Sequence, residues 1–105
     1  MQLSTVLQND CLILRIEGEL DMLSAVDVPP AVDQILTEGY SSVVVDLTRL
    51  RLMDCAGARA LVSMWRHLRQ AGRTWKFLQP TEQPLTLLGL LRIDRLLFEP
   101  ASGRA

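Results

Sequence analysis

In the middle of the chain, a run of β-branched residues is followed by a loop and then by apolar residues at helical spacing. Val43-Val44-Val45-Asp46-Leu47 is typical of a buried strand, and the apolar residues after Gly57 recur as they do in a helix. Asp54 is therefore expected where a loop meets the first turn of a helix. Backbone N–H groups are unpaired there and carboxylates accept hydrogen bonds from them, so the sequence predicts that Asp54 caps the helix.

Strands and helices alternate along most of the sequence. Residues 3–7 and 11–17 flank Asn9-Asp10 and predict a hairpin. The further expected elements are a turn at 24–26, a helix from Val28 that is capped by Asp27 and ends at Gly39, a strand at 42–47, a helix at 56–70, a strand at 74–78, a helix at 81–91 with Thr81 as candidate cap, and a strand at 96–98. This alternation implies a largely parallel sheet with right-handed crossovers.

Composition restricts the kind of protein. A chain of 105 residues with 49% apolar residues is the size of one globular domain. A net charge of −1 gives no general attraction to nucleic acid. No apolar run is long enough to span a bilayer and no leader pattern is present, so we expect no membrane insertion and a cytoplasmic protein. Residues 101–105 are expected to be a flexible tail.

The residues that usually carry chemistry are sparse. Cys11 and Cys55 are expected to be reduced thiols, and with the single histidine, His67, they do not form a standard zinc site. There is no glycine-rich phosphate loop and no nucleophile–base pair, so no catalytic residue, cofactor or metal is expected. Cys55 is interpreted as a small, buried apolar residue; a redox-sensitive thiolate at the helix start is the alternative. The basic residues of the 56–70 helix and its exit, among them Arg73, are expected to be solvated.

Several short blocks, in order, carry a family resemblance. They are Gly18-Glu19-Leu20-Asp21 with Ser24-Ala25 behind it, Asp46-Leu47-Thr48 followed after a spacer by Asp54-Cys55-Ala56-Gly57, Ala71-Gly72-Arg73, and Ile93-Asp94-Arg95. Together they resemble the signature of STAS domains, the family of anti-sigma factor antagonists. The resemblance implies a single α/β domain over residues 1–100, with a mixed, mostly parallel sheet and helices packed mainly on one face.

The resemblance also implies a function. It points to a non-enzymatic regulator that captures a kinase-like anti-sigma factor and so frees a sigma factor. The alternative is a STAS subunit or scaffold of another complex, such as a lipid-transport ATPase or a stress-signalling assembly. The implied partner-binding residues are Asp21, Ser24, Asp54, Cys55, Ala56, Gly57 and Arg59. From its position, Asp21 is equally well explained as a turn-stabilising carboxylate.

The sequence departs from the family pattern at two places. Phosphorylated members carry a serine at the position of Ala56, and neither Ala56 nor Cys55 has a hydroxyl oxygen to receive phosphate. We therefore expect no phosphorylation in this loop, while the small Ala56 and Gly57 would still let a partner approach closely. Arg92 stands where the family usually has glycine, so we expect the end of the preceding helix to be remodelled.

Overall fold

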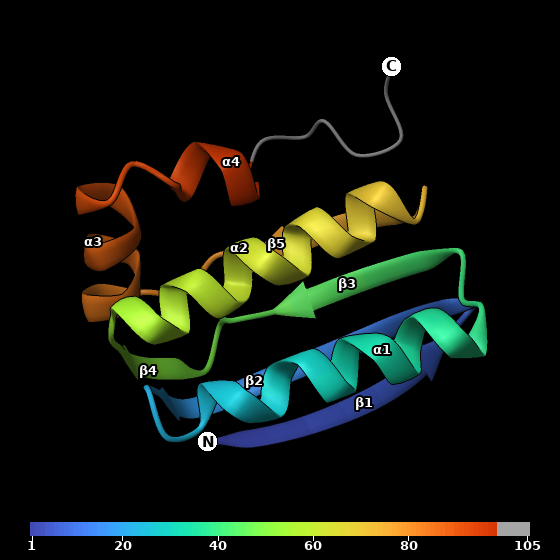
Figure 1. The fold of residues 1–105 in the computed structure, drawn as a ribbon, viewed down its shortest axis with the longest axis horizontal. Coiled ribbons are helices and arrows are strands. Elements are labelled where there is room, and N and C mark those ends of the chain that lie inside the picture. Colours follow the sequence, from blue (N-terminus) through green and yellow to red (C-terminus); the bar gives the residue numbers. More distant parts are fainter. Residues whose placement is uncertain (99–105) are drawn as a thin grey trace.

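A mixed β-sheet forms the centre of the computed structural model, which describes residues 1–98 (Figure 1). The strands of this part are β1 (Gln2–Gln8), β2 (Cys11–Leu20), β3 (Ser42–Asp46), β4 (Leu50–Met53) and β5 (Thr74–Leu78). The order is β1-β2-β3-β5, with β1 antiparallel to β2 and the other pairs parallel. The end of β2, from Gly18 to Leu20, pairs parallel with β4, and the register of this pair shifts between Gly18 and Glu19. The predicted tail lies outside the described residues.

The helices gather on one side of this sheet. They are a short 3-10 turn η1 (Ala25–Asp27), α1 (Val28–Glu38), α2 (Cys55–Gln70), α3 (Glu82–Leu90) and α4 (Asp94–Phe98). Helices α1 and α2 lie side by side across the sheet, α3 packs against β4, and α4 contacts β5 (Figure 1). The predicted architecture, a mostly parallel mixed sheet with helices mainly on one face, is confirmed.

Alternation along the strands explains this layering. On β2 the side chains of Leu12, Leu14 and Ile16 are buried, whereas the residues between them are only partly covered. The same alternation on β3 buries Val43 and Val45. These faces meet the apolar stripe of the helices, which includes Val32, Ile35, Leu61, Met64 and Leu68. One core therefore lies between the sheet and the helices.

Local turn chemistry places most element ends where the sequence predicts them. Asn9 and Asp10 both have positive φ, 52° and 63°, which is the two-residue type I′ turn of a tight hairpin. Gly39 ends α1 in the left-handed conformation with φ 81°. Asp27 and Thr81 occupy the expected positions before α1 and α3, but neither side chain makes a capping hydrogen bond.

Two expectations about the C-terminal part of the chain are wrong, and one strand was not predicted. The strand predicted at 96–98 is part of helix α4, where the Leu97 N–H donates to the Ile93 carbonyl oxygen. An apolar run this short fits the residue spacing of a strand as well as that of a helix. Arg92 adopts φ 60° without remodelling α3, because the Ile93 N–H closes the helix end on the Leu88 carbonyl oxygen. Strand β4 was not predicted, since its buried residues Leu50 and Met53 do not alternate.

Candidate functional site

Two loops meet beyond the carboxyl end of β2. The first is the turn 21–24, which leaves β2 after Leu20, and the second is residue 54 with the first turn of α2. The Asp54 N–H donates to the Leu20 carbonyl oxygen at 3.2 Å, which holds the second loop beside the end of β2. The sequence-predicted residues of both loops are thus brought together, as expected for the carboxyl end of a sheet.

Asp54 links the two loops through its side chain. One carboxylate oxygen accepts the Gly57 N–H at 2.9 Å and thereby caps α2, as predicted. The other oxygen accepts the Met22 N–H of the first loop at 3.0 Å. A single carboxylate therefore fixes both the start of α2 and the turn after β2.

Asp21 and Ser24 organise the first loop. One Asp21 oxygen accepts the N–H groups of Leu23 and Ser24, each at 3.0 Å, and lies 3.1 Å from the Ser24 hydroxyl. In return, the Ser24 hydroxyl oxygen accepts the Asp21 N–H at 3.0 Å. The hydrogen bond from the Ser24 N–H, opposed by some desolvation and aided by the Ser24 hydroxyl, lowers the pKa of Asp21. The turn-stabilising role of Asp21 is confirmed.

The first turn of α2 presents small side chains. Cys55 is exposed and Ala56 is half-buried, while Arg59 is exposed one turn further along the helix. The interpretation of Cys55 as a buried filler is therefore wrong, because the first position of α2 points away from the core. Among the described residues, no hydrogen bond or ion pair ties the Arg59 side chain to the two loops.

Gly57 has a different role from the one expected. It is buried, and a Cβ atom built on it would overlap the backbone oxygen of Leu20 and lie 2.8 Å from Cγ of Met53. Glycine is needed here because α2 packs directly on the end of β2. The expectation that Gly57 leaves room for a partner is corrected: that room is already occupied by β2 and β4.

An exposed apolar group beside these loops was missed by the sequence reasoning. The side chains of Met22, Leu23 and Val26 are 69%, 82% and 68% exposed. No periodicity singles them out, since they lie in a turn and a 3-10 segment, and only the fold shows that they are uncovered. Exposed apolar residues that gather in one place are a mark of interaction surfaces.

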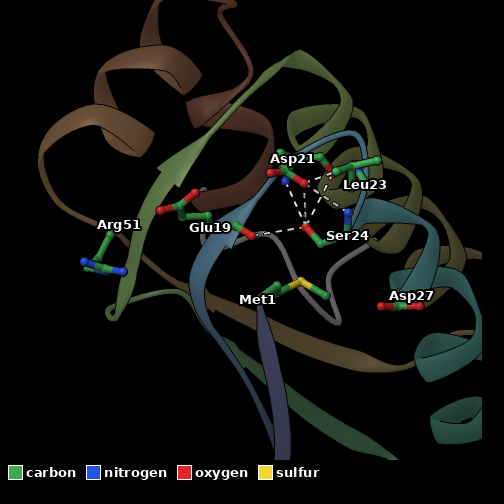
Figure 2. A pocket seen from close by; sticks show the side chains of 7 residues that line it. All are labelled: Met1, Glu19, Asp21, Leu23, Ser24, Asp27 and Arg51. Atoms are coloured by element: carbon green, nitrogen blue, oxygen red, sulfur yellow. Dashed lines mark hydrogen bonds between the residues drawn. The ribbon is translucent and has the colours of Figure 1, made fainter.

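Carboxylates lie beside Leu23 of this apolar group. An open hollow of about 500 Å³ lies here, and Leu23 and Ser24 are among the residues that line it (Figure 2). Glu19, Asp21 and Asp27 also line it, against two positive groups, the Arg51 guanidinium and the amino terminus at Met1. The surface therefore combines uncovered aliphatic side chains with an excess of negative charge.

The remaining candidates lie away from this surface. His67 is exposed, with Nδ1 2.7 Å from the Ser63 carbonyl oxygen on its own helix. Arg73 is not simply solvated as expected: its guanidinium donates to the carbonyl oxygens of Leu36 and Tyr40 and so ties β5 to the end of α1. In residues 1–98 no group of three or more metal-ligating side chains gathers. None of the helices in that range has the length and apolarity needed to cross a bilayer.

Comparison with protein-family models decides the family. The STAS domain model matches residues 2–103, which is nearly the whole chain. The chain belongs to the STAS domain family. A sequence search of curated proteins finds no match.

Solved STAS structures share the fold. A Thermotoga maritima protein assigned as an anti-sigma factor antagonist is 21% identical with a TM-score of 0.79, over 91% of this chain and 83% of that one. The anti-sigma factor antagonist SpoIIAA in its unphosphorylated form is 20% identical with a TM-score of 0.64, over 88% and 81%. A sulfate transporter family protein from Wolinella succinogenes is 17% identical with a TM-score of 0.74, over 90% and 76%. At these identities the likeness shows the fold alone.

Proposed function

We propose that this STAS domain is a non-enzymatic binding regulator that captures a kinase-like anti-sigma factor in the cytoplasm. The contact surface is the turn 21–24 together with Asp54, Cys55, Ala56 and Arg59 at the start of α2. The observation that carries the proposal is the double hydrogen bond of Asp54 to Met22 and Gly57, which joins two separate loops into one preformed surface. A preformed surface loses little conformational entropy when it binds.

The chemistry of this surface supports a protein partner. Leu23 and Met22 together offer aliphatic area of the kind that is desolvated at the centre of an interface. The carboxylates of Glu19, Asp21 and Asp27 line a hollow beside Leu23 and form a negative rim on that side. The complementary partner presents an apolar residue flanked by arginine or lysine.

Gly57 takes part indirectly. Because it lies against Leu20, it positions the first turn of α2 so that Cys55 is exposed and Ala56 is half-buried. Its contribution to binding is the placement of its neighbours.

Ala56 bears on how binding is regulated. A phosphate group at residue 56 would add about −1.5 to −2 charges at pH 7 next to the Asp54 carboxylate, and like-charge repulsion together with desolvation of the phosphate would weaken close contact at this loop. Ala56 has no hydroxyl to accept it. We therefore infer that the protein behaves as a permanently unphosphorylated antagonist whose control lies elsewhere.

Substitution of one exposed leucine tests the surface. Leu23→Asp should weaken binding to a purified anti-sigma factor from the same organism by at least tenfold, as measured by isothermal titration calorimetry. Leu90→Asp is the matched control, because Leu90 is 76% exposed and lies on α3. Neither change touches the core, so both proteins should unfold at nearly the wild-type temperature. Equal affinity of the two variants would reject this surface.

A second experiment tests the phosphorylation inference. Wild type incubated with the anti-sigma factor and ATP should acquire no phosphate at residues 54–57 by mass spectrometry. Ala56→Ser should acquire one if that partner is an active serine kinase. Phosphorylation of wild type at Thr48 or Ser63 would show that the switch has moved to another residue.

A further inference from the structure

Strand β1 leaves one edge of the sheet open. It pairs with β2 over its whole length, and within residues 1–98 no backbone hydrogen bond reaches its outer side (Figure 1). Gln8 and Cys11 flank the two-residue hairpin turn and therefore form a hydrogen-bonded pair. Because these pairs alternate, the N–H and C=O groups of Leu3, Thr5 and Leu7 point away from β2.

This edge lacks the usual protection. Natural edge strands commonly carry lysine, proline, a bulge or an inward-pointing charge that prevents pairing with other chains. The sequence of β1 is QLSTVLQ, with no charged residue and no proline, and its register with β2 is regular. Val6 and Leu7 on this strand are 40% and 55% exposed. The open edge is thus both polar in its backbone and partly apolar in its side chains.

The strand is complementary to itself. We propose that two copies of this chain pair antiparallel through β1, with a twofold axis at Thr5. This register places Gln2 opposite Gln8, Leu3 opposite Leu7, Ser4 opposite Val6, and Thr5 opposite Thr5 of the second copy. With no charge on either strand, the pairing brings no like charges together, and equivalent residue types meet at most positions.

The backbone agrees with the same register. The outward-pointing residues Leu3, Thr5 and Leu7 meet their counterparts, which allows about six N–H···O=C bonds between the copies. Leu7 packs against Leu3 of the second copy, and Leu3 is itself in contact with the core. A shift of one residue would place the outward-pointing groups of one copy opposite inward-pointing groups of the other. Only this register, or one shifted by two residues, lets the outward N–H and C=O groups of both strands pair.

The geometry of the pair leaves the proposed contact surface free. That surface lies beyond the carboxyl end of β2, next to the start of β1. In the antiparallel pair, the contact surface of the second copy lies at the opposite end of the continuous sheet. The interface is a single strand pair, smaller than a standard stable interface, so we expect a weak dimer that depends on protein concentration.

Thr5→Pro is the direct test, with Thr5→Val as matched control. Proline removes an N–H that points outwards, so the hydrogen bonds between β1 and β2 remain, as at natural edge prolines. Valine keeps the N–H. In sedimentation equilibrium, wild type and Thr5→Val should shift towards dimer as concentration rises, while Thr5→Pro should stay monomeric and folded. A monomeric wild type up to its solubility limit would overturn the proposal.

Disulfide trapping tests the register independently, in a background with Cys11→Ser and Cys55→Ser. Opposed residues of a hydrogen-bonded pair have Cα atoms about 5.5 Å apart, within reach of a disulfide. Thr5→Cys should therefore form a covalent dimer under mild oxidation. Gln2→Cys should form no such dimer. At about 3.4 Å per residue, Gln2 lies roughly 20 Å from Gln2 of the second copy in this register. Equal trapping of both variants, or pairing of β1 with another protein instead of a second copy, would refute this symmetric dimer.

Discussion

Replacing Gly57 and Gly89 by alanine should change stability in opposite directions. Both residues lie within helices, where alanine is favoured over glycine by about 1 kcal/mol. At Gly89 a new Cβ meets nothing within 4 Å, so Gly89→Ala should keep this gain. At Gly57 the Cβ would overlap the Leu20 backbone oxygen and press on Met53 Cγ at 2.8 Å.

The magnitude at Gly57 follows from what must move. Overpacking a well-packed core typically costs about 1–3 kcal/mol, and a backbone oxygen in a strand yields less readily than a side chain. The cost should therefore lie at the upper end of this range, about 3 kcal/mol, and subtraction of the helix-propensity gain of about 1 kcal/mol leaves a loss of about 2 kcal/mol for Gly57→Ala. For a chain of this size this lowers the unfolding temperature by roughly 10 °C, whereas Gly89→Ala should raise it by about 4–8 °C.

Thermal unfolding followed by circular dichroism, supported by urea titration at 25 °C, measures both variants. A Gly57→Ala protein as stable as wild type would mean that α2 can slide away from β2 without loss. The account of how the first turn of α2 is seated would then be wrong.

Three further predictions concern single hydrogen-bonded groups. Asp54→Ala should lower the free energy of unfolding in urea by about 2 kcal/mol. Asp54→Asn still caps α2 but cannot accept the Met22 N–H, so it should lower that free energy by about 1 kcal/mol. Equal losses would contradict the bridging role of Asp54. The pKa of Asp21 lies below its ordinary 3.8. The stability advantage of wild type over Asp21→Asn should therefore be full above pH 3.8 and vanish as the pH falls through the lowered pKa. If acid titration shows an advantage that persists at lower pH, the ionised carboxylate is not its source. Arg73→Ala should cost about 2 kcal/mol in chemical denaturation, because the carbonyl of Leu36 loses a charged donor; an unchanged midpoint would mean water replaces it.

Much of the fold could be predicted because its signals are local. The hairpin at Asn9-Asp10, the end of α1 at Gly39 and the cap at Asp54 each depend on a few neighbouring residues. Helix α4 and strand β4 could not, since each is four or five residues long and is stabilised by packing on distant elements.

The candidate site was only partly accessible from the sequence. Asp21 and Asp54 stood out because carboxylates at element ends have few roles. The burial of Gly57 could not be inferred, because it depends on how closely α2 approaches β2. The exposure of Leu23 could not be inferred either, because Leu23 lies in a turn where no periodic pattern separates buried from exposed residues. A glycine in a motif can serve either a partner or the chain itself, and spacing alone does not separate the two.

The two tryptophans offer a separate optical signal for this molecule. Trp65 on α2 and Trp75 on β5 meet edge to face, with ring centroids 6.4 Å apart, and Arg69 lies over the Trp65 ring. Trp65 is ten residues along α2 from its start, about 15 Å along the helix axis, and about 9 Å beyond Arg59. Intrinsic fluorescence should therefore report the docking of α2 on β5 and stay silent when a partner occupies the loops. Unfolding can then be followed by tryptophan emission with a partner present and no label on the contact surface.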